Sequence, residues 1–89
     1  MNLDSKLTVP PQVISRLVGD ETVLLDLESG LYFGLDNVGQ YIWEAVSAGK
    51  NLGEASDAVV SEYDVDKVQA EADVIEFAST LVARGLLAE

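Results

Sequence analysis

The most constraining feature of this sequence is a change in its hydrophobic periodicity near residue 36. Before that point, residues 13–18, 22–27 and 31–35 form short runs rich in apolar and β-branched side chains, separated by turn residues. After it, apolar residues recur every three or four positions, which is typical of amphipathic helices. The sequence therefore predicts an α+β domain in which a three-stranded antiparallel sheet precedes three helices.

The second and third strands are predicted to form a hairpin, because residues 28–30 are a three-residue connection that ends in glycine. Pairing Leu25 with Phe33 would place six apolar side chains on one face and Asp26 on the other. A register shifted by one residue would bury Asp26 and expose Phe33, so we expect the unshifted pairing. The six residues predicted for the core face of this hairpin are Val23, Leu25, Leu27, Leu31, Phe33 and Leu35.

The helix ends are marked by capping residues. Asp36 or Asn37 is expected to begin the first helix, which would end near Gly49 and bury Trp43. Asn51, with Glu54 three residues later, has the pattern of a capping box and should open the second helix. The third helix is expected from residue 65 or 66 to about residue 84, with a glycine just after it.

The predicted third helix carries more apolar surface than one packing partner requires. An ordinary amphipathic helix buries a stripe about 100° wide, and here a second stripe, which includes Val74 and Leu81, adjoins the first. Two interpretations remain open: the second stripe packs on the sheet, or it lines a groove available to another molecule.

The strand at residues 31–35 is a candidate for pairing with another chain. If it lies at the edge of the sheet, its sequence has no Pro, no Lys and no charge before Asp36, which are the usual means of blocking an edge. An alternative interpretation is that the edge is simply short.

Composition narrows the classes of function. The 89 residues have a formal net charge of −11, which disfavours nucleic acids and anionic membranes as partners. The absence of Cys and His removes the commonest catalytic and zinc-binding groups, so we expect neither an enzyme nor a metal or cofactor. The length predicts one domain over residues 13–89 with an extended lead-in at residues 1–12. We expect a cytoplasmic monomer, since no signal sequence or membrane span is recognisable.

The order and spacing of several segments resemble the PqqD family, which comprises small recognition elements for ribosomally synthesised, modified peptides. The resemblance covers residues 13–88. Its residues are the segment 24–39, which contains Gly-Leu-Tyr-Phe-Gly-Leu-Asp-Asn-Val-Gly at 30–39, then Ile42, Trp43, Asp73, Val74, Phe77, Leu81 and the Gly-Leu-Leu at 85–87.

This resemblance implies a winged helix-turn-helix-like fold and a non-catalytic role in peptide binding. The leader segment of a precursor peptide would add to the third strand as a further antiparallel strand, with its side chains in a groove beside the third helix. The residues that the resemblance assigns to this site are Leu31, Tyr32, Phe33, Gly34 and Leu35 of the strand and Asp73, Val74, Phe77, Ala78 and Leu81 of the helix. Tyr32 could instead be an exposed cross-strand partner of Asp26.

Within the family, the chain is most similar to the stand-alone members of lasso-peptide pathways, which are a branch of antibiotic biosynthesis. That similarity implies two partner enzymes, a transglutaminase-like leader peptidase and an ATP-dependent cyclase. An alternative is a peptide chaperone for pyrroloquinoline quinone biosynthesis, which would present its precursor to a radical S-adenosylmethionine enzyme. An acyl-carrier-like protein is an alternative of another class, although Ser29 lies in a predicted turn rather than at the start of a helix.

Overall fold

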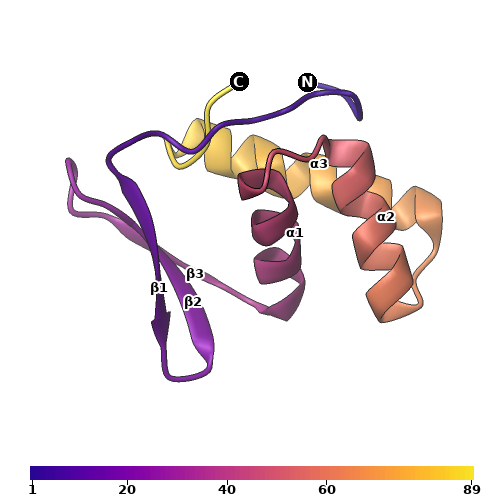
Figure 1. Cartoon of the computed structure of the whole chain (residues 1–89), viewed down its shortest axis with the longest axis horizontal. Coiled ribbons are helices and arrows are strands. Elements are labelled where there is room, and N and C mark those ends of the chain that lie inside the picture. Colours follow the sequence, from indigo (N-terminus) through magenta and orange to yellow (C-terminus); the bar gives the residue numbers. More distant parts are fainter.

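The computed structural model describes residues 1–89 and contains three strands followed by three helices. Figure 1 shows the sheet beside the helices, with α1 leading directly from the last strand into the helical part. This order confirms the predicted α+β class. The elements are β1 (Val13–Val18), β2 (Glu21–Asp26), β3 (Tyr32–Leu35), α1 (Asn37–Ser47), α2 (Leu52–Tyr63) and α3 (Lys67–Ala83).

The three strands form an antiparallel meander with β2 at its centre. Thr22, Leu24 and Leu35 are buried on the face of the sheet that meets the core, whereas Val23 and Leu25 are half-buried on the other face. Because β2 separates the outer strands, β1 and β3 each have one edge without a strand partner.

The β2–β3 register differs by one residue from the predicted one. Leu24, and not Leu25, pairs with Phe33, so the predicted pairing was wrong. The loop has four residues, 27–30, and is closed by the backbone N–H of Asp26, which donates to the carbonyl of Leu31 at 2.9 Å. Leu27 and Leu31, which were expected in the core, are 60% and 69% exposed.

The side chain of Asp26 explains this register. Its Oδ1 accepts hydrogen bonds from the backbone N–H groups of Glu28, at 2.9 Å, and Ser29, at 3.2 Å, so the carboxylate organises the turn. Asp26 is only 8% exposed, but its burial is compensated by these two donors. Burial of Asp26 therefore stabilises the turn, whereas from the apolar pattern alone it was expected to be unfavourable.

The predicted helix caps are confirmed. Asp36 precedes α1, and its Oδ1 accepts the backbone N–H of Gly39 at 2.7 Å. Asn51 and Glu54 form both hydrogen bonds of a capping box at the start of α2. Asp66 caps α3 in the same way, through the backbone N–H of Gln69.

The core lies mainly among the helices and the inner face of the sheet. Trp43 is buried, as predicted, and Leu24, Leu52, Val74 and Leu81 have no exposed surface. The fully buried side of α3 packs chiefly against α2 rather than on the sheet. The neighbouring helix α2 covers most residues of the second apolar stripe of α3. Most of that stripe therefore neither packs on the sheet nor lines a groove.

The N-terminal segment covers another part of the helical surface. It runs beside α3 in Figure 1, and Leu7 is buried in the core. The carbonyls of Ser5 and Leu3 accept the first backbone N–H groups of α2, and Thr8 exchanges two backbone hydrogen bonds with Ala88.

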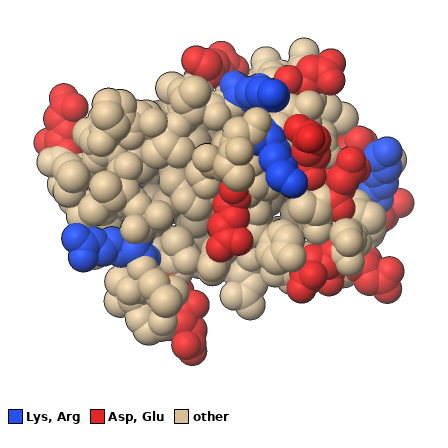
Figure 2. Space-filling view, viewed as in Figure 1, with Lys and Arg blue, Asp and Glu red and all other residues tan.

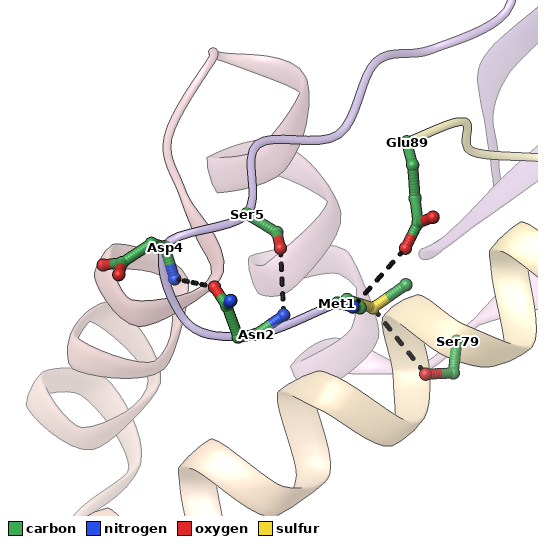
Figure 3. Close-up of polar contacts among 6 residues, drawn as sticks. All are labelled: Met1, Asn2, Asp4, Ser5, Ser79 and Glu89. Atoms are coloured by element: carbon green, nitrogen blue, oxygen red, sulfur yellow. Dashed lines mark hydrogen bonds and ion pairs between the residues drawn. The ribbon is translucent and has the colours of Figure 1, made fainter.

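Further polar contacts hold the first residues of the chain (Figure 3). The Sδ atom of Met1 accepts from the hydroxyl of Ser79 at 3.7 Å, and its α-amino group lies 3.8 Å from the carboxylate of Glu89. The two ends of the chain therefore lie together on α3.

In the view of Figure 2, acidic side chains are most numerous over the helical part of the molecule, and both acidic and basic side chains stand at the margins of the sheet. None of the helices is long and apolar enough to cross a lipid bilayer.

Candidate peptide-binding groove

The outer edge of β3 carries unpaired backbone groups. Because the Asp26 N–H bonds to the Leu31 carbonyl, this pair is a hydrogen-bonded pair of the antiparallel ladder. Hydrogen-bonded pairs alternate along such a ladder, so Phe33 and Leu35 also direct their backbone groups toward β2. The N–H and C=O groups of Tyr32 and Gly34 therefore point outward, away from β2. An added strand would pair with these two residues.

A groove runs between β3 and α3 and consists of two hollows. The first hollow has a volume of about 460 Å³ and is open to solvent. Its floor combines the aromatic ring of Phe77 with apolar side chains of α1, and three carboxylates stand at its rim. The residues that line it are Phe33, Asp36, Val38, Gly39, Ile42, Asp73, Glu76, Phe77 and Thr80.

The second hollow, of about 270 Å³, lies at the other end of the groove, where α3 ends. It is mainly apolar, with one cation at its border. Its lining residues are Asp26, Leu31, Tyr32, Phe33, Ala83, Arg84 and Leu86. Phe33 belongs to both hollows and therefore separates them.

Phe33 is held in place by Arg84. The guanidinium carbon lies 5.2 Å from the centre of the Phe33 ring, within the range of a cation–π interaction. The ring is half-buried and packs against the core. This pair connects β3 to the end of α3 and forms the partition between the two hollows.

A close approach of α1 to α3 shapes the first hollow. A Cβ atom on Gly39 would lie 3.0 Å from Cε1 of Phe77, which is closer than side chains normally approach. Glycine at this position therefore permits the observed placement of the Phe77 ring beside α1. The ring forms part of the floor of the first hollow because no methyl group displaces it.

The ten residues predicted for the site fall into three groups. Leu31, just before β3, and Tyr32 and Gly34 on β3 are exposed, with Tyr32 77% exposed, and Phe33 lies between the hollows. Asp73 and Phe77 line the first hollow. The remaining four, Leu35, Val74, Ala78 and Leu81, are buried in the core.

The burial of Val74, Ala78 and Leu81 corrects their predicted role as direct groove contacts. All three have no exposed surface and line neither hollow. The helical stripe that they form faces the core, and the groove is bordered by the next positions around the helix, Asp73, Phe77 and Thr80. The buried three support the groove from beneath.

Sequence reasoning missed most of the groove residues outside β3 and α3. Val38, Gly39 and Ile42 come from α1, and Arg84 follows the end of α3. None of these four was among the predicted site residues. The position of Asp36 directly after β3 was a usable signal, because a residue that follows the pairing strand must lie near the end of the groove.

The family model for "Coenzyme PQQ synthesis protein D (PqqD)" matches residues 21–87, which include both hollows. The chain belongs to the PqqD family. No curated protein sequence matches it.

Two solved structures are similar to this PqqD-family chain. One is described as TbiB1 in complex with the TbiA(beta) leader peptide; it is 41% identical, with a TM-score of 0.84, over 90% of this chain and 93% of that chain. The other is described as lasso peptide synthetase B1 complexed with the leader peptide; it is 24% identical, with a TM-score of 0.89, over 96% of this chain and 100% of that chain. The second similarity concerns the fold alone.

Proposed function

We propose that this protein is a non-catalytic adaptor that binds the leader segment of a ribosomally synthesised precursor peptide by strand addition to β3. The observation that carries the proposal is the unpaired edge of β3 beside a groove with apolar walls. In strand addition, backbone hydrogen bonds supply affinity and pockets for alternate side chains supply selectivity. This groove has both features, because the outer edge of β3 offers unpaired backbone groups and the two hollows can receive side chains.

A lasso-peptide pathway is favoured over quinone biosynthesis. The support is the 41% identity to a chain solved with a leader peptide, TbiB1, over nine-tenths of the sequence. The adaptor would act in the cytoplasm, where precursor peptides are synthesised, and would present the leader to a transglutaminase-like peptidase and an ATP-dependent cyclase. Co-purification of the leader-bound protein with a peptidase encoded beside its gene would test this part.

Binding can be tested with Gly34→Pro, which removes one outward-pointing N–H from the β3 edge. Proline is tolerated at sheet edges, and Gly34 donates no hydrogen bond to β2, so the fold should persist. The expected loss is about 1–3 kcal/mol, since a hydrogen bond disappears and a peptide carbonyl is left without a partner. That corresponds to roughly 5–150-fold weaker binding.

The matched control is Ser15→Pro on β1. By the same alternation, Ser15 directs its backbone groups outward at the opposite edge of the sheet, far from the groove. Fluorescence anisotropy with labelled TbiA(beta) leader peptide would measure affinity, and circular dichroism would verify folding. We expect Ser15→Pro to bind like the wild type. Equal affinity of a folded Gly34→Pro protein would contradict strand addition at β3.

A further inference from the structure

The two hollows of the groove differ in charge. Asp36, Asp73 and Glu76 line the first hollow, and no Lys or Arg accompanies them. The second hollow contains Arg84 as its only cation and Asp26 as its only carboxylate; Asp26 is 8% exposed and its Oδ1 already accepts the backbone N–H groups of Glu28 and Ser29. The groove is therefore electrically asymmetric along its length, with three carboxylates near the end of β3 and an exposed cation beside a largely buried carboxylate near its beginning.

These charges are not neutralised within the protein. The only ion pair in the molecule joins Met1 and Glu89, neither of which lines the groove. Asp36 and Asp73 each accept one hydrogen bond at Oδ1, from the Gly39 backbone and from the Gln69 amide, which leaves their second oxygens without a protein donor. Glu76 accepts none through its side chain. Carboxylates accept only, so this rim is suited to a guest group that donates hydrogen bonds.

Arg84 also has capacity for a guest. Its guanidinium carbon lies over the Phe33 ring, 5.2 Å from the ring centre, and the side chain has no carboxylate partner. The guanidinium N–H groups are therefore available for an acceptor on a guest. The apolar neighbours Leu31 and Leu86 make the same hollow suitable for an aliphatic stem.

Strand geometry fixes the spacing between the guest side chains that enter the two hollows. Both existing strand pairs in this sheet are antiparallel, and an antiparallel addition is the more stable arrangement. Guest side chains opposite Leu35, Phe33 and Leu31 would face α3, because these two β3 residues and the residue just before the strand share the core-facing side of the hairpin. The guest would meet Leu35 first, so these positions are i, i+2 and i+4, and the outer two lie roughly 13 Å apart.

We propose that this groove selects a peptide of defined charge polarity. The side chain at position i has an apolar stem and a cationic, hydrogen-bond-donating tip that reaches the rim of Asp36, Asp73 and Glu76. The side chain at position i+4 is acidic or aliphatic and faces Arg84. This inference rests on the proposed function, because it takes strand addition to β3 as its starting point, and it defines the class of leader segment that the groove accepts.

The test is a charge scan of the labelled TbiA(beta) leader peptide. Each position is replaced in turn by Lys, by norleucine, which has the lysine stem without its amine, and by Glu. We expect one position at which affinity falls in the order Lys, norleucine, Glu, with at least fivefold between the extremes. At the position four residues closer to the C-terminus of the peptide, the Lys peptide should have the lowest affinity of the three.

Protein variants assign each preference to its hollow. Asp73→Asn combined with Glu76→Gln should reduce the preference for Lys over Glu at position i to less than twofold, without changing the discrimination against Lys at position i+4. Arg84→Gln should remove the discrimination at position i+4 and leave the preference at position i unchanged. Both effects should shrink at high salt, because exposed charges are screened.

Two results would overturn this proposal. One leaves the proposed strand addition intact, and the other rejects the proposed function as well. If the peptides bind but show no such pair of positions, or show the opposite polarity, the charge-selection proposal fails and strand addition stands. If no peptide of the scan binds to the folded protein, the proposed function fails together with it.

Discussion

Replacing Asp26 by Ala should destabilise the protein substantially, although aspartate is rarely a core residue. The substitution removes the Oδ1 acceptor of two backbone N–H groups in the β2–β3 turn. Hydrogen bonds to a charged acceptor each contribute about 1.5–3 kcal/mol, but here the two donors belong to exposed residues that can turn to water. We therefore expect a loss of about 2 kcal/mol in the free energy of unfolding, close to that for a helix cap.

This loss is large for a domain of this size. A chain of this length has a total stability of roughly 5–13 kcal/mol, so about 2 kcal/mol should lower the melting temperature by roughly 8–16 °C. Urea denaturation followed by the fluorescence of buried Trp43 would measure the change.

Two variants show whether the acceptor atom is responsible. Asp26→Asn retains an Oδ1 that can accept both N–H groups, so it should cost less than about 1 kcal/mol. Asp20→Ala alters the β1–β2 turn, where the side chain is exposed and makes no hydrogen bond, and should stay within about 0.5 kcal/mol. If Asp26→Ala were as stable as the wild type, or Asp26→Asn equally destabilised, the explanation of the register would be refuted.

Three further predictions concern other parts of the fold. Leu24→Ala should cost about 2–5 kcal/mol in urea denaturation, because Leu24 is fully buried in the sheet; a cost below 1 kcal/mol would place it outside the core. Gly39→Ala should shift the Phe77 ring into the first hollow and weaken TbiA(beta) leader binding in anisotropy assays while the protein stays folded; unchanged affinity would remove that ring from the site. The neighbouring carboxylate of Glu62, which accepts a hydrogen bond from Tyr41, raises the pKa of that phenol. The contribution of this group to stability is therefore present below about pH 10 and is lost as pH rises through the folded-state pKa. Glu62→Gln should make Tyr41 ionise at lower pH in a tyrosinate absorbance titration, and an unmoved titration would contradict this cause.

Local signals predicted much of the fold. Element order, the caps at Asp36 and Asn51, and the burial of Trp43 all depend on residues close together in the sequence. The hairpin register was wrong because apolar pattern and turn chemistry disagreed at Asp26. The apolar side chains alone favour a register that exposes Asp26, but the two backbone N–H groups that donate to its carboxylate favour the observed one.

The groove was harder to predict because it depends on how α1 and α3 meet. Asp73, Phe77 and the β3 residues were named from the sequence, but Val74, Ala78 and Leu81 are beneath the surface. A difference of one position around a helix decides between core and groove, and the direction of the α3 packing face follows from its contact with α2. The cation–π contact between Arg84 and Phe33 likewise joins elements that are distant in the sequence.

The shortness of β3 has a consequence for how long a guest would remain. A strand of four residues with two outward-pointing members offers about four backbone hydrogen bonds, each worth roughly 1 kcal/mol net. Backbone contacts alone would therefore hold a peptide only at about millimolar strength. Residence time would be governed by the side chains seated on either side of Phe33. A guest bound in this way would dissociate quickly once its side chains leave the hollows, because only a few main-chain hydrogen bonds would then have to break.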